Sequence, residues 1–106
     1  MSDEDREVAL RFKKRLLESG VPVVELRVYG SRARGDFSPE SDLDVFLIVR
    51  ELTRKIRETI SELAWECGFD ADKVITTVEF TPDEVLRTPL RASPFIHAVM
   101  EEGIVV

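Results

Sequence analysis

The sequence predicts an α/β fold of the α+β kind, with a small mixed sheet of three to four strands and helices packed on it. Segments with a helical apolar period alternate with short runs rich in β-branched residues. One of these runs, residues 43–49, is almost continuously apolar, which is typical of a central strand covered on both faces. The length of 106 residues suits one hydrophobic core, so we expect residues 1–106 to form a single domain.

The first half of the chain is expected to run helix, strand, polar segment, strand. Apolar residues recur every four positions in 4–19, which predicts an amphipathic helix. Residues 23–29 follow a proline and predict the first strand. The polar segment 30–41 is expected to contain a short helical turn that starts at Ser31, with Gly35 at positive φ where the chain leaves it.

The second half continues the alternation with the clearest helical stripe of the chain, over residues 52–67. Gly68 is expected to cap this helix at its C-terminus. The remaining expected elements are a strand over 73–80, a helix that begins at Pro82, a last helix over 94–102 and an edge strand over 104–106.

Composition and charge narrow the classes of function. The chain is 43% apolar and 34% charged, as in folded globular domains. Its formal net charge of −6 argues against general nucleic-acid binding, which needs a basic face. A nucleotide is still compatible with this charge, because a metal ion can bridge carboxylates and phosphates.

Localisation is expected to be cytoplasmic, without membrane insertion. The longest apolar run, residues 45–49, is far too short to span a bilayer. The acidic start of the chain, residues 2–5, is unlike a signal peptide. The single cysteine, Cys67, excludes an internal disulfide and suits a reducing compartment.

Asp42 and Asp44 are the first candidates for chemistry. Side chains two apart on a strand point to the same face, and this pair opens the apolar strand 43–49. Two neighbouring carboxylates repel each other unless a cation lies between them. Mg²⁺ accepts one or two carboxylates and keeps positions for phosphate oxygens, which suits phosphoryl or nucleotidyl transfer.

Gly30 and Ser31 supply a complementary anion site. Glycine permits a tight turn after the strand, and Ser31 starts the helical turn, whose free N–H groups and hydroxyl can bind phosphate. Arg34 lies about one turn further on and is a second candidate phosphate ligand, although a surface role fits it equally well. Arg32 points elsewhere on the turn, and we expect it at the surface or in a partner contact.

These residues together resemble a known family. Gly-Ser-x-Ala-Arg-Gly over 30–35, followed by Ser-Asp-x-Asp-Val over 41–45, is similar to the signature of the polymerase-beta-like nucleotidyltransferases, and most of all to the minimal nucleotidyltransferases of bacteria and archaea. The resemblance is strongest over residues 29–49. The order and length of the surrounding helices and strands agree with it.

The resemblance implies a nucleotidyltransferase fold and a role for each matched residue. Gly30 and Ser31 would bind the triphosphate of ATP, with Arg34 on the family's Ala-Arg-Gly element. Asp42 and Asp44 would bind Mg²⁺. Members of this family often pair with a HEPN-type helical protein encoded beside them, for which the small nucleotidyltransferase acts as an antitoxin, by contact, by transfer of AMP, or by both.

A third carboxylate completes the catalytic set of the family, on the strand ahead of the next helix. That strand holds one acid in this chain, Glu79, which we take as the third catalytic candidate. Alignment on the helix that begins at Pro82 places the acid of the family nearer Thr76 or Val78. A shift of one residue turns a strand side chain to the opposite face, so the register decides whether Glu79 reaches the site.

Two functions therefore stay open from the sequence. One is metal-dependent transfer of a nucleoside monophosphate, AMP from ATP, to a hydroxyl on a partner protein. The other is a catalytically weak or inactive antitoxin subunit that neutralises a HEPN-type toxin by binding. Trp65 lies off the apolar stripe of its helix and could belong to a partner interface, and residues 104–106 leave a homodimer open as well.

Overall fold

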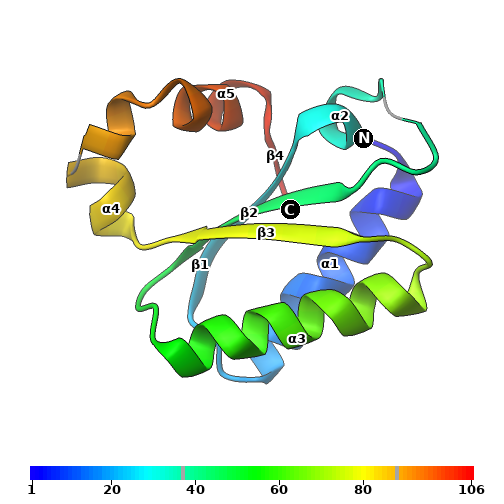
Figure 1. Cartoon of the computed structure of the whole chain (residues 1–106), viewed down its shortest axis with the longest axis horizontal. Helices are drawn as coiled ribbons and strands as arrows, with labels where there is room; N and C mark the ends of the chain where they lie inside the picture. Colours follow the sequence, from blue (N-terminus) through cyan, green and yellow to red (C-terminus); the bar gives the residue numbers. More distant parts are fainter. Residues whose placement is uncertain (37, 88) are drawn as a thin grey trace.

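The computed structural model describes residues 1–36, 38–87 and 89–106 (Figure 1). The elements are α1 (Asp3–Glu18), β1 (Val23–Tyr29), α2 (Gly30–Arg34), β2 (Leu43–Val49), α3 (Arg54–Asp70), β3 (Ile75–Phe80), α4 (Pro82–Arg87), the 3₁₀ helix η1 (Pro89–Ala92), α5 (Pro94–Glu102) and β4 (Ile104–Val105). They follow the order expected from the sequence, with one addition, the short 3₁₀ helix η1 between α4 and α5.

The strands form one mixed sheet in the order β3-β2-β1-β4, which confirms the predicted fold class. β1 runs antiparallel to β2 and to β4, whereas β2 and β3 are parallel. Parallel strands need a crossover connection, and α3 provides it. The almost continuously apolar β2 lies inside the sheet, between β1 and β3, as its composition predicts.

Helices cover the two faces of the sheet unequally. Side chains of α1 and α3 pack on one face against alternate residues of β1 and β2, such as Leu26, Val28, Val45 and Leu47, and form the main core. A smaller core lies on the opposite face, where residues of α4 and α5 pack around Phe46. Figure 1 shows α1 and α3 along one side of the strands and α4 and α5 grouped on the other.

The end of α3 differs from the prediction. The helix continues through Gly68 to Asp70, so Gly68 is an interior residue and not a cap. A Cβ atom at this position would lie 2.7 Å from the carbonyl oxygen of Lys73, so glycine permits the close approach of the chain that leads into β3. Asp72 makes the turn instead, with φ of 56°.

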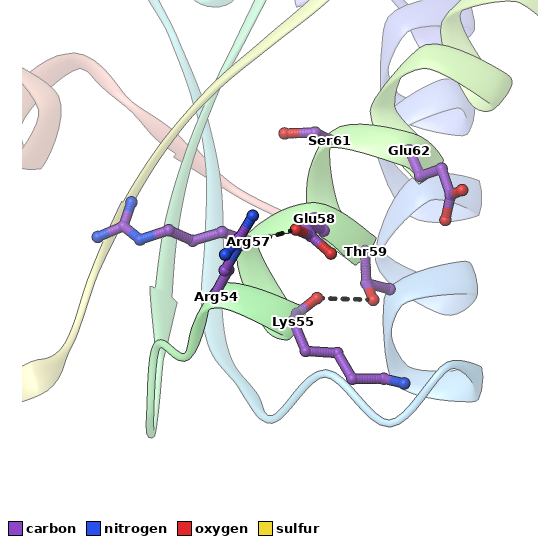
Figure 2. A pocket seen from close by; sticks show the side chains of 7 residues that line it. All are labelled: Arg54, Lys55, Arg57, Glu58, Thr59, Ser61 and Glu62. Atoms are coloured by element: carbon purple, nitrogen blue, oxygen red, sulfur yellow. Dashed lines mark hydrogen bonds and ion pairs between the residues drawn. The ribbon is translucent and has the colours of Figure 1, made fainter.

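A hollow of about 1100 Å³ lies along the outer side of α3. Every residue that lines it belongs to this one helix, and its side chains bond among themselves, as Arg54 does with Glu58 (Figure 2). No second element closes it, so it is a surface depression rather than a binding pocket. In the described part of the chain, no helix combines the length and apolarity that a membrane crossing needs.

Candidate functional site

The candidate site lies at one end of the sheet, where three strands bring one residue each to the same level. In the register of the sheet, Asp44 of β2 pairs with Tyr29 of β1 on one side and with Thr76 of β3 on the other. Cross-strand partners share a face of the sheet, so these three side chains are neighbours. Their face is the one that α4 and α5 cover only in part.

Gly30 and Asp44 are in direct contact. A Cβ atom on Gly30 would lie 2.6 Å from carboxylate oxygen Oδ2 of Asp44, which is closer than a Cβ atom comes to an atom in a non-bonded contact. Gly30 also has φ of 74°, a left-handed conformation that costs other residues about 1–2 kcal/mol. Glycine is therefore required twice at this position, for the turn from β1 into α2 and for the space that the carboxylate occupies.

The other oxygen of Asp44 is held by the neighbouring strand. The Thr76 hydroxyl donates a hydrogen bond of 2.6 Å to Oδ1. Tyr29 borders the carboxylate on the other side, and burial, with a smaller effect of the Asp44 charge, raises the pKa of its phenol. The Tyr29 ring is itself held by Phe95, edge to face, with centroids 5.4 Å apart. Asp44 thus has a fixed orientation.

Ser31 and Asp42, the predicted phosphate and metal ligands, lie close to Gly30 and Asp44 in the chain. Ser31 is half-buried and follows Gly30 in the first turn of α2, the helical turn predicted there, and Gly35 ends that turn at φ of 83°, as expected. Asp42 is exposed and lies one residue ahead of β2, where strand alternation sets it on the face of Asp44. The structure therefore gathers Gly30, Ser31, Asp42 and Asp44 at one end of the sheet.

Arg34 lies at the edge of this group. Its side chain is exposed and forms ion pairs with Asp36 at 3.3 Å and with Glu102 of α5 at 3.4 Å. Exposed pairs of this kind contribute little to stability and exchange partners readily. Arg34 is thus available at the surface of α2 but is not directed at Asp44 by any contact that the structure shows.

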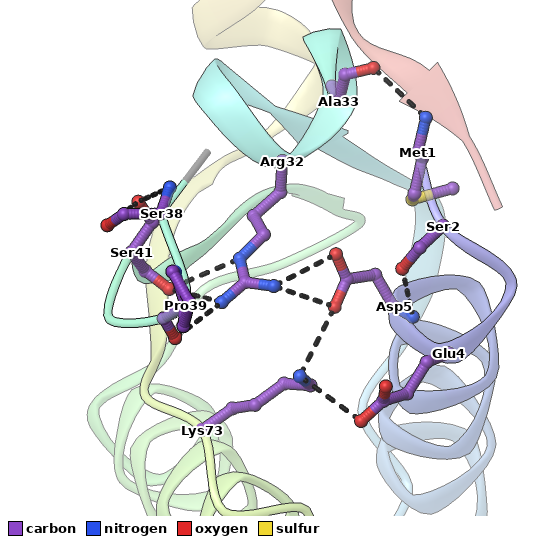
Figure 3. Close-up of polar contacts among 10 residues, drawn as sticks. All are labelled: Met1, Ser2, Glu4, Asp5, Arg32, Ala33, Ser38, Pro39, Ser41 and Lys73. Atoms are coloured by element: carbon purple, nitrogen blue, oxygen red, sulfur yellow. Dashed lines mark hydrogen bonds and ion pairs between the residues drawn. The ribbon is translucent and has the colours of Figure 1, made fainter. Parts of the chain in front are cut away.

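Arg32 is not at the surface, contrary to the expectation from the sequence. Only 3% of the residue is exposed, and its guanidinium pairs with the fully buried Asp5 of α1 at 3.3 Å (Figure 3). The spacing on the turn correctly separates Arg32 from Arg34, but it does not reveal that α1 packs on this side. A sequence signal does exist, because Asp5 lies three positions before Val8 and so continues the apolar stripe of α1.

Glu79 is the predicted catalytic residue that the structure does not bring to this site. It pairs with Leu47, whose side chain packs in the core under α1 and α3, whereas Thr76 pairs with Asp44. Three residues along a strand is an odd step, so Glu79 points to the opposite face. Burial there raises the pKa of its carboxyl group, with the nearby charge of Arg57 in partial opposition.

The residues that are present fit a divalent metal ion with a reduced set of protein ligands. Asp42 and Asp44 supply carboxylate oxygens, the ligands that Mg²⁺ prefers, and Mg²⁺ is bound in many proteins by one or two carboxylates with phosphate oxygens. Among the described residues, no three acidic, histidine or cysteine side chains are gathered around one point. Thr76 has the position from which a third carboxylate would face Asp44.

The chain belongs to the nucleotidyltransferase domain family, whose model matches residues 7–106. This match covers the whole candidate site and agrees with the resemblance seen in the sequence. No curated protein matches the chain.

Solved structures share the fold at low sequence identity. A variant of the toxin–antitoxin complex MntA-HpeT has 17% identity and a TM-score of 0.63, over 92% of this chain and 70% of that one. A toxin–antitoxin structure with AMP-PNP has 19% identity and a TM-score of 0.59, over 90% and 69%. A candidate nucleotidyltransferase from Sulfolobus solfataricus has 16% identity and a TM-score of 0.56, over 99% and 87%.

The contact between Gly30 and Asp44 can be tested with two matched glycine substitutions. Gly30→Ala should lower the free energy of unfolding by about 2–4 kcal/mol, from left-handed strain and from displacement of Asp44. Gly35→Ala is the control, because Gly35 has a similar φ but nothing within 4 Å of its Cβ position. It should cost only the strain, about 1–2 kcal/mol. Equal losses in urea unfolding would show that the carboxylate does not occupy the space beside Gly30.

Proposed function

We propose that the chain is a magnesium-dependent nucleotidyltransferase that transfers AMP from ATP to a hydroxyl group on a partner protein. The observation that carries this proposal is the Asp44 carboxylate, which lies against Gly30 and accepts a hydrogen bond from Thr76. Ser31 directly follows Gly30, and Asp42 lies two residues before Asp44. Membership in the nucleotidyltransferase family supports the class of reaction. The structural relative with AMP-PNP supports an adenine nucleotide as substrate.

Each residue has a role in this reaction. Asp42 and Asp44 would hold Mg²⁺, which neutralises charge on the triphosphate and stabilises the attacking and leaving oxygens. Ser31 donates its hydroxyl to a phosphate oxygen, and Gly30 keeps the backbone close. The acceptor hydroxyl oxygen forms a bond to the α-phosphorus, the bond from that phosphorus to the oxygen that bridges to the β-phosphate breaks, and pyrophosphate leaves. The hydroxyl proton passes to water.

Thr76 limits the rate in this proposal. A threonine hydroxyl cannot accept the proton of the attacking group at neutral pH, and a positioned general base contributes about 10²- to 10⁴-fold to such reactions. Glu79 does not replace it, because its side chain lies on the other face of the sheet. Binding of nucleotide is therefore expected to be ordinary and transfer to be slow.

Removal of the two carboxylates should abolish metal-dependent nucleotide binding. In calorimetric titrations of ATP with Mg²⁺, the folded variant Asp42→Asn/Asp44→Asn should show no binding, because an amide does not carry the charge that holds the metal. Glu79→Gln is the matched control and should bind like the wild-type protein. If the control loses binding and the double variant keeps it, the site has been assigned to the wrong face of the sheet.

Replacement of Thr76 by aspartate should restore the missing group. Thr76→Asp is expected to raise the rate of AMP transfer by about 10²-fold or more, since the new carboxylate faces Asp44 and can act as a base. Without metal the two acids repel each other, so the variant should melt at a lower temperature, and Mg²⁺ should reverse the loss. Label transfer from α-labelled ATP measures the rate, and Thr76→Val is the control. No gain over the control would exclude a base at this position.

A second function, neutralisation of a HEPN-type toxin by contact, is favoured by a separate observation. Trp65 and Phe69 stack on each other, with centroids 5.3 Å apart, yet are 68% and 72% exposed on the outer side of α3. Val74 extends this apolar surface toward β3, which is an edge strand. Exposed aromatic side chains of this size mark interaction surfaces. The structural relatives MntA-HpeT are toxin–antitoxin complexes, which supports a protein partner.

Contact and catalysis make opposite predictions for two variants. If binding alone neutralises a HEPN-type toxin, Trp65→Glu/Phe69→Glu should abolish protection when this chain is co-expressed with that toxin in growth assays, and Asp42→Asn/Asp44→Asn should protect fully. Leu17→Glu controls for an added charge at an exposed apolar residue of α1. If transfer is required, the two aspartate substitutions abolish protection although the variant still binds its partner.

A further inference from the structure

We propose that Arg32 is a positioning residue, which fixes the backbone that carries Asp42 relative to the turn that carries Ser31. The inference rests on the proposed function, in which this site binds Mg²⁺ and nucleotide. Its geometric part, that Arg32 holds the backbone before Asp42, can be tested without nucleotide. Arg32 directly follows Ser31, and its side chain reaches the segment that ends at Asp42. One buried side chain thus connects the phosphate-binding turn with the start of the metal-binding pair.

The contacts of the guanidinium group are with backbone carbonyls as well as with an acid. Nε and Nη2 of Arg32 donate to the carbonyl oxygen of Ser41 at 3.2 and 2.8 Å, and Nη2 also donates to that of Pro39 at 3.2 Å. Ser41 immediately precedes Asp42. Three N–H groups of Arg32 thus hold two backbone carbonyls of one short segment. Because this fixes the backbone just before Asp42, Arg32 sets the direction in which the Asp42 side chain points.

Asp5 anchors this guanidinium from the other side. Both of its carboxylate oxygens accept from Nη1 of Arg32, at 3.4 and 3.3 Å, and Asp5 is fully buried (Figure 3). Lys73 lies 3.6 Å from Asp5 and 3.3 Å from Glu4, and it belongs to the connection that leads into β3 and Thr76. The same charge cluster therefore touches the three segments that deliver Ser31, Asp42 and Thr76 to the site.

The geometry requires arginine rather than any cation. A guanidinium is planar and presents five donors in a fixed arrangement, which here serve two carbonyls and one carboxylate at once. A lysine ammonium can keep the ion pair with Asp5, but it cannot reach both sides of the cluster. Arg32→Lys consequently leaves the buried charge of Asp5 paired and removes mainly the hydrogen bonds to the carbonyl oxygens of Pro39 and Ser41.

The test compares Arg32→Lys with the wild-type protein in two measurements. Affinity for ATP with Mg²⁺ should fall by about 10- to 100-fold, the loss typical when a residue that orients a metal ligand is replaced. Amide hydrogen exchange should become about tenfold faster at Ser41, Asp42 and Leu43, with no change at Leu26 and Leu47 in the centre of the sheet. Ile60→Val, a core substitution in α3, controls for lost stability and should change neither measurement locally.

The outcomes separate this inference from the proposed function. If the wild-type protein binds no nucleotide, the proposed function fails, and exchange at 41–43 still decides whether Arg32 holds the segment. Wild-type exchange and affinity in folded Arg32→Lys would overturn the inference. Where Arg32→Lys does not fold, Asp5→Leu/Arg32→Met replaces it, because this variant removes both buried charges together. It should fold and show the same local loss of protection, and unchanged protection would again overturn the inference.

Discussion

The approach of the Asp44 carboxylate to the Gly30 backbone is the contact on which the site depends. It needs a residue without a side chain at the end of β1, an acid at the matching position of β2 and a hydroxyl on β3 that holds the second oxygen. All three conditions follow from the register of the sheet, in which Tyr29, Asp44 and Thr76 lie at one level. The polar end of β2 is tolerated because the rest of the strand is buried between two apolar layers.

The two faces of the sheet have different roles, one in the core and one in the candidate site. The face under α1 and α3 holds most of the core and also takes up Glu79, whereas the face with Asp44 is closed only in part, by α4 and α5. Among the described residues, the buried charges are those of Asp5 and Arg32, which pair with each other, and the partly buried Lys73 lies beside them. A buried ion pair contributes little net stability, since desolvation offsets the attraction, so geometry is the better explanation for its presence.

Much of this structure could be predicted from the sequence, and the exceptions have physical causes. The alternating periods predict the strands and the α-helices, although not the 3₁₀ helix η1. The spacing of Gly30, Ser31, Asp42 and Asp44 predicts the residues that the fold brings together. Glu79 could not be placed, because a one-residue uncertainty in register inverts the face of a strand side chain. Burial of Arg32 depends on where α1 packs. The close approach at Gly68 depends on the path of the chain after α3. Neither of these two features is a local property of the sequence.

The position of a metal ion in a crystal of this protein, grown with Mn²⁺ and a non-hydrolysable ATP analogue, tests the assigned site most directly. Anomalous scattering locates Mn²⁺ without reference to the surrounding atoms. We predict a single strong peak within about 2.5 Å of carboxylate oxygens from both Asp42 and Asp44, with the triphosphate against Gly30 and Ser31. A bound nucleotide with no peak between these carboxylates, or a peak at Glu79 on the other face of the sheet, would contradict this assignment.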